Sequence, residues 1–80
     1  MNAAWIRVEY SLDSLADISP TDFEATLHDA LKQRWPGALV NIAQTSCNKY
    51  NGENADGSEI AREDIHQISQ DVFRQLCEGV

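Results

Sequence analysis

The residues that could carry out chemistry are concentrated between Asn51 and Ile65, in the stretch NGENADGSEIAREDI. Carboxylates and amides surround two glycines there, a composition typical of an ion site, of a surface for a positively charged partner, or of a capped helix. A calcium loop of the EF-hand type needs a carboxylate at its first position and a glycine at its sixth. With Gly57 sixth, the first position is Gly52, which has no side-chain oxygen, and the preceding CNKYNG is turn-like rather than helical. We therefore predict no metal site in a segment whose acidic and amide residues are Asn51, Glu53, Asn54, Asp56, Glu59, Glu63 and Asp64.

The same segment has the composition of a helix start. The side chain of Asp56 or Ser58 can accept hydrogen bonds from the unpaired N–H groups of a first helical turn. Glu59 and Glu63 then lie near the positive end of the helix dipole. Each of these effects stabilises a helix by about 1 kcal/mol or less and needs no ion. We predict an amphipathic helix that starts at Ser58.

Catalysis requires a nucleophile, a base and an orienting group that converge on one point. The candidates are His28, His66, Cys47 and Cys77, and no spacing along the chain brings a cysteine and a histidine together. Phosphate-binding glycine loops and HExxH motifs are absent from the sequence. We read the histidines as surface residues and the cysteines as small, partly buried thiols, and we predict a non-enzymatic protein without catalytic residues or cofactor.

Charge restricts the kind of partner. The 80 residues carry a net charge of -7, which opposes direct contact with nucleic-acid backbones or anionic bilayers and favours basic partners. Two cysteines thirty positions apart are too few for a disulfide framework, so we predict free thiols in a reducing cytoplasm. No apolar run approaches the roughly 20 residues of a membrane span, and MNAAWIRVEY lacks the features of a signal peptide.

The first half of the chain has a clear pattern. From Trp5 to Tyr10 the residues alternate between two sides, Ile6, Val8 and Tyr10 on one and Trp5, Arg7 and Glu9 on the other. This period of two predicts a half-buried strand. Ser19 followed by Pro20 is typical of a helix start, and apolar residues recur at helical spacing until Pro36-Gly37 stops the helix.

The second half predicts another strand over Leu39 to Ala43, a short third strand between Thr45 and Tyr50, and the helix from Ser58 with Gly79 as its stop. Length limits the chain to a single domain, residues 1–80. The fold class is then α/β (α+β), a small two-layer sandwich of order β-α-β(-β)-α. Two helices should pack on one face of a two- to three-stranded sheet, and the first crossover should be parallel. The predicted core comprises Ile6, Val8, Phe23, Leu27, Leu31, Val40, Ile42, Ile65, Ile68, Val72 and Leu76.

Carboxylates also recur along the last helix. Asp64, Asp71 and Glu78 repeat every seven residues, so they form one line of charge, which we call the acidic ridge, with Glu63 beside it. A line of carboxylates on a rigid helix can take the place of phosphates before a groove lined with Lys and Arg. An ordinary solvated face is the alternative, because Arg74 is spaced to pair with both Asp71 and Glu78 and to mute them.

Several short motifs along most of the chain resemble the DinI-like family, which is related to DNA-damage-inducible protein I. The order of the motifs matches that family: a strand with an alternating V-E, a helix that ends in aromatic-Pro, a V-x-I/V strand, and a final helix that starts like K-x-D-K-x-x-I. The residues that carry the resemblance are Val8-Glu9, Trp35-Pro36, Val40, Ile42, and Arg62, Glu63, Asp64, Ile68 and Ser69, followed by Val72, Phe73 and Glu78.

Members of that family bind the RecA recombinase filament of the SOS response, and their acidic C-terminal helix is thought to imitate single-stranded DNA. The resemblance implies that Glu63, Asp64, Asp71 and Glu78 face a RecA-like partner. We expect the protein itself to be a monomer or homodimer. One alternative is a phage- or plasmid-encoded inhibitor of a host defence or repair complex whose basic channel normally holds nucleic acid. Another is a small oligomeric structural subunit that buries Trp5, Trp35 and Tyr50.

Overall fold

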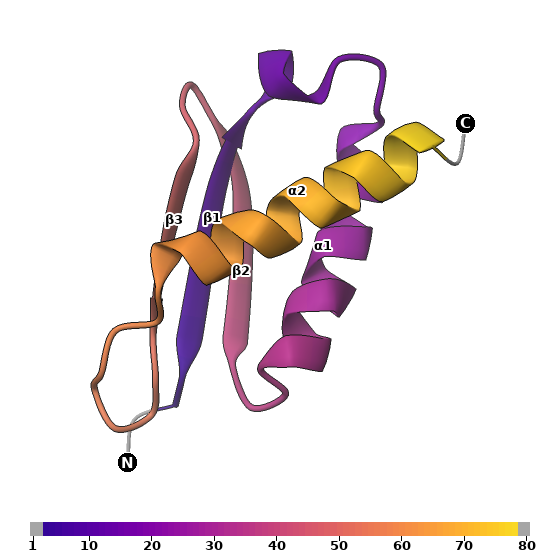
Figure 1. Ribbon diagram of the computed structural model, residues 1–80. Helices are drawn as coiled ribbons and strands as arrows, with labels where there is room; N and C mark the ends of the chain where they lie inside the picture. Colours follow the sequence, from indigo (N-terminus) through magenta and orange to yellow (C-terminus); the bar gives the residue numbers. More distant parts are fainter. Residues whose placement is uncertain (1–2, 79–80) are drawn as a thin grey trace.

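The computed structural model describes residues 3–78 and contains a mixed three-stranded sheet with two α-helices (Figure 1). The two-layer α+β fold predicted from the sequence is confirmed, with a third strand and the order β-α-β-β-α. None of the helices within residues 3–78 is long and apolar enough to cross a membrane. The elements are β1 (Trp5–Ser11), a 3-10 turn η1 (Leu12–Leu15), α1 (Pro20–Arg34), β2 (Leu39–Thr45), β3 (Lys49–Glu53) and α2 (Arg62–Glu78).

The sheet has the strand order β2-β1-β3, with β1 parallel to β2 and antiparallel to β3. The alternation along β1 places Ile6, Val8 and Tyr10 on the buried face, while Trp5 and Arg7 on the opposite face are exposed. Both helices cover the same face, and α2 crosses it from the β3 side toward α1 (Figure 1). The parallel pairing of β1 with β2 confirms the expected crossover through α1.

Helix α1 has the bounds that its flanking residues predicted. It begins at Pro20, with Ser19 as an N-cap whose side chain makes no capping hydrogen bond. At the other end, the Trp35 N–H donates to the Leu31 carbonyl at 2.8 Å, and the following Pro36 cannot continue the helix. Phe23, Leu27 and Leu31 form its buried stripe.

Helix α2 begins at Arg62, so the prediction of a start at Ser58 was wrong. Residues 58–60 extend alongside β3 instead: the Asn54 N–H donates to the Ser58 carbonyl at 2.7 Å, and the Ile60 N–H to the Gly52 carbonyl at 3.0 Å. Ile60 is buried against Gly52, where a Cβ would lie 3.2 Å from the Cβ of Ile60. Pairing and burial therefore outweigh the local tendency to extend the helix. The predicted stop, Gly79, lies outside the described residues.

Asp56 organises a turn and not the helix start. Its carboxylate accepts the Ser58 N–H at 2.9 Å and the Ser58 hydroxyl at 2.6 Å, and these hydrogen bonds lower its pKa. Gly57 has φ +90°, a backbone conformation that glycine adopts without the steric cost of a Cβ. The helix start itself has Glu63 and Asp64 in its first turn, where their charges suit the helix dipole, whereas Glu59 lies before the helix.

The third strand lies later than the sequence suggested. β2 extends to Thr45, a turn follows in which the Thr45 hydroxyl donates to the Cys47 carbonyl at 2.8 Å, and β3 starts at Lys49. The pairing of Val8 with Tyr50 sets this register and turns the Tyr50 side chain toward the helices.

The hydrophobic core confirms seven of the predicted residues as buried: Ile6, Val8, Phe23, Leu27, Leu31, Ile65 and Val72. Four others are only half-buried, because they lie on an edge strand or on the flanks of α2: Val40, Ile42, Ile68 and Leu76. Residues that the prediction omitted complete the core: Tyr10, Leu15, Ala38 and Ile60, with Ser69 as a buried polar residue. Two of these additions, Leu15 and Ile60, come from segments outside the main helices and strands, whose burial depends on long-range packing.

Candidate functional site

The acidic ridge lies on a single continuous helix. Asp64, Asp71 and Glu78 are all exposed on α2, and Glu63 is exposed beside the first of them. Seven residues of α-helix advance about 10 Å, so the three carboxylates are spaced evenly along the rod. The helix positions them because Ile65 and Val72, roughly 100° around the axis from the ridge, anchor the adjacent side of α2 in the core.

Ion pairs within the described part of the chain do not neutralise the charges of the ridge. Across residues 3–78, no Lys, Arg or His nitrogen lies within 4.0 Å of the carboxylates of Glu63, Asp64, Asp71 or Glu78. Arg74 therefore does not form the pairs with Asp71 and Glu78 that its spacing permits. Asp71 accepts a hydrogen bond from the Gln67 Nε2 at 3.0 Å, which holds its side chain without cancelling its charge. The ridge is a row of solvated carboxylates.

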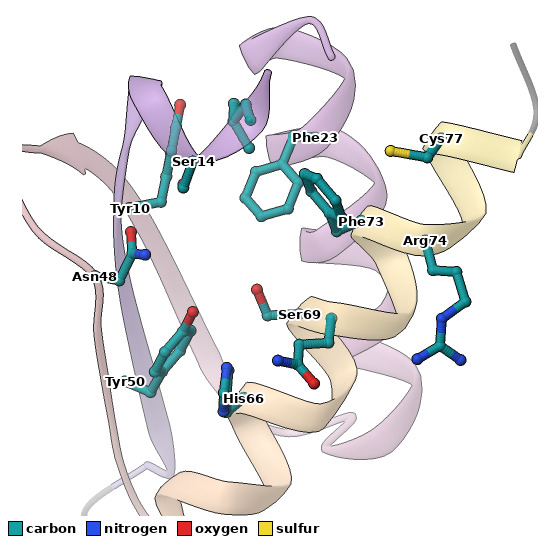
Figure 2. Close-up of a pocket in the computed structure, with 12 residues that line it drawn as sticks. Tyr10, Ser14, Phe23, Asn48, Tyr50, His66, Ser69, Phe73, Arg74 and Cys77 are labelled. Atoms are coloured by element: carbon teal, nitrogen blue, oxygen red, sulfur yellow. The ribbon is translucent and has the colours of Figure 1, made fainter. Parts of the chain in front are cut away.

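A groove of about 510 Å³ lies beside α2, opposite the β1–η1 junction and the start of β3 (Figure 2). Its floor is aromatic and its rim is polar, and α2 contributes one wall. The lining residues are Tyr10, Ser14, Leu15, Phe23, Asn48, Tyr50, His66, Ser69, Gln70, Phe73, Arg74 and Cys77.

The floor of the groove is held by Tyr10. Its ring packs edge-on against Phe23 with centroids 5.2 Å apart, and its hydroxyl donates to the Glu24 carboxylate on α1. Burial, this hydrogen bond and the negative charge of Glu24 raise the pKa of Tyr10 to about 12. Tyr10 is therefore a neutral structural donor at physiological pH, joining β1 to α1.

The rim of the groove joins β3 to α2. The rings of Tyr50 and His66 lie 4.9 Å apart with an interplanar angle of 33°, and Figure 2 shows them facing each other across the opening. The Ser69 side chain points toward the interior, while that of Arg74 points away from it (Figure 2). Such a groove offers an aromatic floor and several hydrogen-bonding groups, which suits a side chain or a short segment of a partner.

Within residues 3–78, the cysteine and the histidine that line the groove are not adjacent. Cys77 and His66 line the same groove, but eleven residues of α2 separate them, about 16 Å along the axis. Both cysteines are exposed, so the prediction of partly buried thiols was wrong. His28 lies on the exposed side of α1, with its Nδ1 4.0 Å from the Asp29 Oδ1. Within residues 3–78, no three His, Cys, Asp or Glu side chains come close enough to hold a metal ion.

Sequence reasoning found the ridge and missed the groove. His66 was assigned to the polar side of the helix, and Tyr50 only to an oligomer contact. A signal was present, because His66, Gln70, Phe73 and Cys77 recur at i, i+4, i+7 and i+11, a second stripe along α2. The residues opposite this stripe come from β1 and β3. The spacing along α2 alone does not predict that these strands pack there.

Comparisons with protein-family models, with curated proteins and with solved structures gave no match. The resemblance to the DinI-like family therefore rests on the motifs and on the order of the elements.

Proposed function

We propose that this protein is a non-enzymatic binding protein that modulates a basic, DNA-handling protein through the acidic ridge and Glu63. The observation that supports the proposal best is the row of exposed carboxylates on α2, none of which forms an ion pair within the described part of the chain. A partner's Lys and Arg can neutralise them without breaking an existing ion pair, so the Coulomb gain is offset only by desolvation and side-chain ordering.

The partner that we propose is a RecA-like recombinase, from the resemblance of the chain to the DinI-like family. The fold has the strand and helix order that this resemblance implies, and the net charge of -7 favours a basic channel over direct contact with DNA. Channels of single-strand-binding proteins are lined by Lys and Arg that track a phosphate backbone. A rigid helix with carboxylates about every 10 Å presents a negative line to such a channel.

The same charge pattern supports a second candidate, an inhibitor of a host defence or repair complex with a nucleic-acid channel of its own. The two candidates differ in the partner and not in the surface. Binding to RecA alone, among purified basic single-strand-binding proteins, favours the first candidate. Binding to another such protein without binding to RecA favours the second.

The test compares two double charge reversals by their affinity for the RecA filament on single-stranded DNA. Asp64→Lys with Asp71→Lys changes the ridge, and Asp22→Lys with Asp29→Lys changes the exposed side of α1. Each pair alters the net charge by four, from -7 to -3, so the two proteins are matched in total charge. We expect the ridge variant to lose at least about tenfold more affinity than the α1 variant, and the wild-type affinity to fall with salt.

Circular dichroism should show both variants folded, because none of the four positions is buried. Equal losses from the two pairs would mean that only net charge matters, which would contradict the assignment of α2 as the recognition element. Binding that depends neither on salt nor on the reversals would point to the aromatic residues Trp5, Trp35 and Tyr50 instead and would refute the proposal.

A further inference from the structure

Strand β2 forms one edge of the sheet and has none of the usual protection of an edge strand. Its seven residues, LVNIAQT, include no charged residue, no proline and no glycine. Exposed edges normally carry charges, proline or a bulge, or are covered by another segment, because their unpaired main-chain groups otherwise attract a further strand. The sequence of β2 therefore leaves this edge ready for pairing.

The opposite edge, formed by β3, is covered by the chain itself. The Gly52 carbonyl accepts the Ile60 N–H at 3.0 Å, and the Asn54 N–H donates to the Ser58 carbonyl at 2.7 Å. β3 also carries two charged residues, Lys49 and Glu53. The β3 edge is thus protected both by pairing and by charged residues, whereas the sequence of β2 provides no charged residue, proline or glycine.

The main-chain groups that β2 turns outward can be identified. The Leu39 N–H donates to the Ala4 carbonyl at 2.8 Å, which directs Leu39 toward β1. Residues of a parallel ladder alternate in the side to which they direct both groups, so Val40, Ile42 and Gln44 direct theirs away from β1. Among residues 3–78, none of the turn, loop, cap or side-chain hydrogen bonds uses these groups.

We propose that β2 pairs antiparallel with β2 of a second copy of this chain, with the two-fold axis at Ile42. In this register Ile42 lies opposite Ile42 of the second copy, Val40 lies opposite its Gln44, and Gln44 lies opposite its Val40. Each of these three pairs exchanges two hydrogen bonds, so all outward N–H and C=O groups are satisfied. The pattern is self-complementary, as an isologous contact requires, and it joins two three-stranded sheets into one continuous sheet.

The uncharged sequence and the exposure of β2 favour a second copy as the occupant. The net charge of -7 on each chain opposes association at long range, but β2 itself carries no carboxylate that pairing would bury. Leu39 is 66% exposed and lies beside Trp5, which is 39% exposed, on the face away from the helices. The proposed register places Thr45 of the second copy next to this Leu39, and it adds cover to Val40 and Ile42, which are half-buried.

Sedimentation equilibrium from micromolar to millimolar protein tests the association. We expect a reversible shift from the 8.9 kDa monomer to a species of twice that mass. Gln44→Pro removes an outward N–H and leaves the β1–β2 ladder intact, because proline is tolerated where its position faces solvent. It should weaken self-association at least about tenfold. Ala55→Pro is the matched control, since Ala55 is exposed at the second position of the turn closed by the Gly57 N–H and the Asn54 carbonyl, where proline is favoured.

Cysteine cross-linking tests the register and does not depend on how Gln44→Pro folds. In a background of Cys47→Ser and Cys77→Ser, both exposed positions, Asn41→Cys with Ala43→Cys should form intermolecular disulfides. The register makes residue 41 of one copy and residue 43 of the other a non-hydrogen-bonded pair, with Cα atoms about 4.5 Å apart, within disulfide range. Asn41→Cys alone should not cross-link, because the diagonal distance is about 7–8 Å.

Dimerisation that is weakened by Gln44→Pro and retained by Ala55→Pro, together with cross-linking of the double cysteine variant only, would support the proposal. A monomer at millimolar concentration would overturn it, even if β2 then accepted a strand from another protein. A dimer that tolerates Gln44→Pro, or one in which Asn41→Cys alone cross-links as efficiently as the double variant, would also overturn it.

Discussion

Replacing Gly52 by alanine tests the packing of the segment before α2 against β3. A Cβ at this position would lie 3.1 Å from the Ile65 Cδ1 and 3.2 Å from both the Cβ and the Cδ1 of Ile60. The two Cδ1 atoms can move by rotation about side-chain bonds. The Ile60 Cβ cannot, because its main chain is held by the hydrogen bond from the Ile60 N–H to the Gly52 carbonyl. The strand pair must therefore separate by a few tenths of an ångström.

The expected size of the effect follows from two opposing terms. Overpacking a well-filled core costs about 1–3 kcal/mol. Replacing glycine by alanine restricts the unfolded chain and returns about 0.4–1 kcal/mol. We expect a net loss of about 1–2 kcal/mol in the free energy of unfolding. With a urea m-value of about 1 kcal/mol/M for so small a domain, the midpoint should fall by about 1–2 M.

Two other glycines serve as controls in the same urea titration. Gly37 has no atom within 4 Å of an added Cβ and an ordinary φ, so Gly37→Ala should be neutral or stabilising by up to about 1 kcal/mol. Gly57→Ala has the same open surroundings but φ +90°, and should cost about 1–2 kcal/mol through the backbone alone. A Gly52→Ala protein as stable as Gly37→Ala would refute the close contact of residues 58–60 with β3.

Three further predictions concern the core, pH and calcium. Leu27→Ala should lower the free energy of unfolding by about 2–5 kcal/mol because Leu27 is fully buried. Ile68 is only half-buried, so Ile68→Ala should lower it less. A Leu27→Ala protein with the melting temperature of the wild type would contradict the packing of α1. Because the pKa of Tyr10 is raised, the unfolded chain loses the hydroxyl proton near pH 10 and the folded chain only near pH 12. The free energy of unfolding should therefore fall between these pH values. In urea titrations at several pH values, Tyr10→Phe should show a smaller fall. Millimolar calcium should leave the melting temperature unchanged, because the Asn51 to Glu63 stretch lacks a complete ligand set; a rise of several degrees that a chelator reverses would refute this.

Local patterns in the sequence were sufficient to predict the type of most elements and the ridge on α2. Period-two alternation identifies β1, and Ser19-Pro20 with Pro36-Gly37 sets the bounds of α1, because these signals act on neighbouring residues along the chain. The ridge is also a local property. A seven-residue repeat on a helix forms one line of charge whatever the helix packs against, provided that the opposite side is apolar.

The tertiary structure decided everything that depends on which distant segments meet. Residues 58–60 have the composition of a helix start, but pairing with β3 and the burial of Ile60 against Gly52 draw them into extended structure. The groove exists only because β1 and β3 bring Tyr10 and Tyr50 opposite α2. Strand order also determines that β2 is an edge whose outward main-chain groups have no hydrogen-bond partner within residues 3–78, while β3 is covered. Pairing energies between segments far apart in the chain leave no local periodicity, so these features could be read only from the folded molecule.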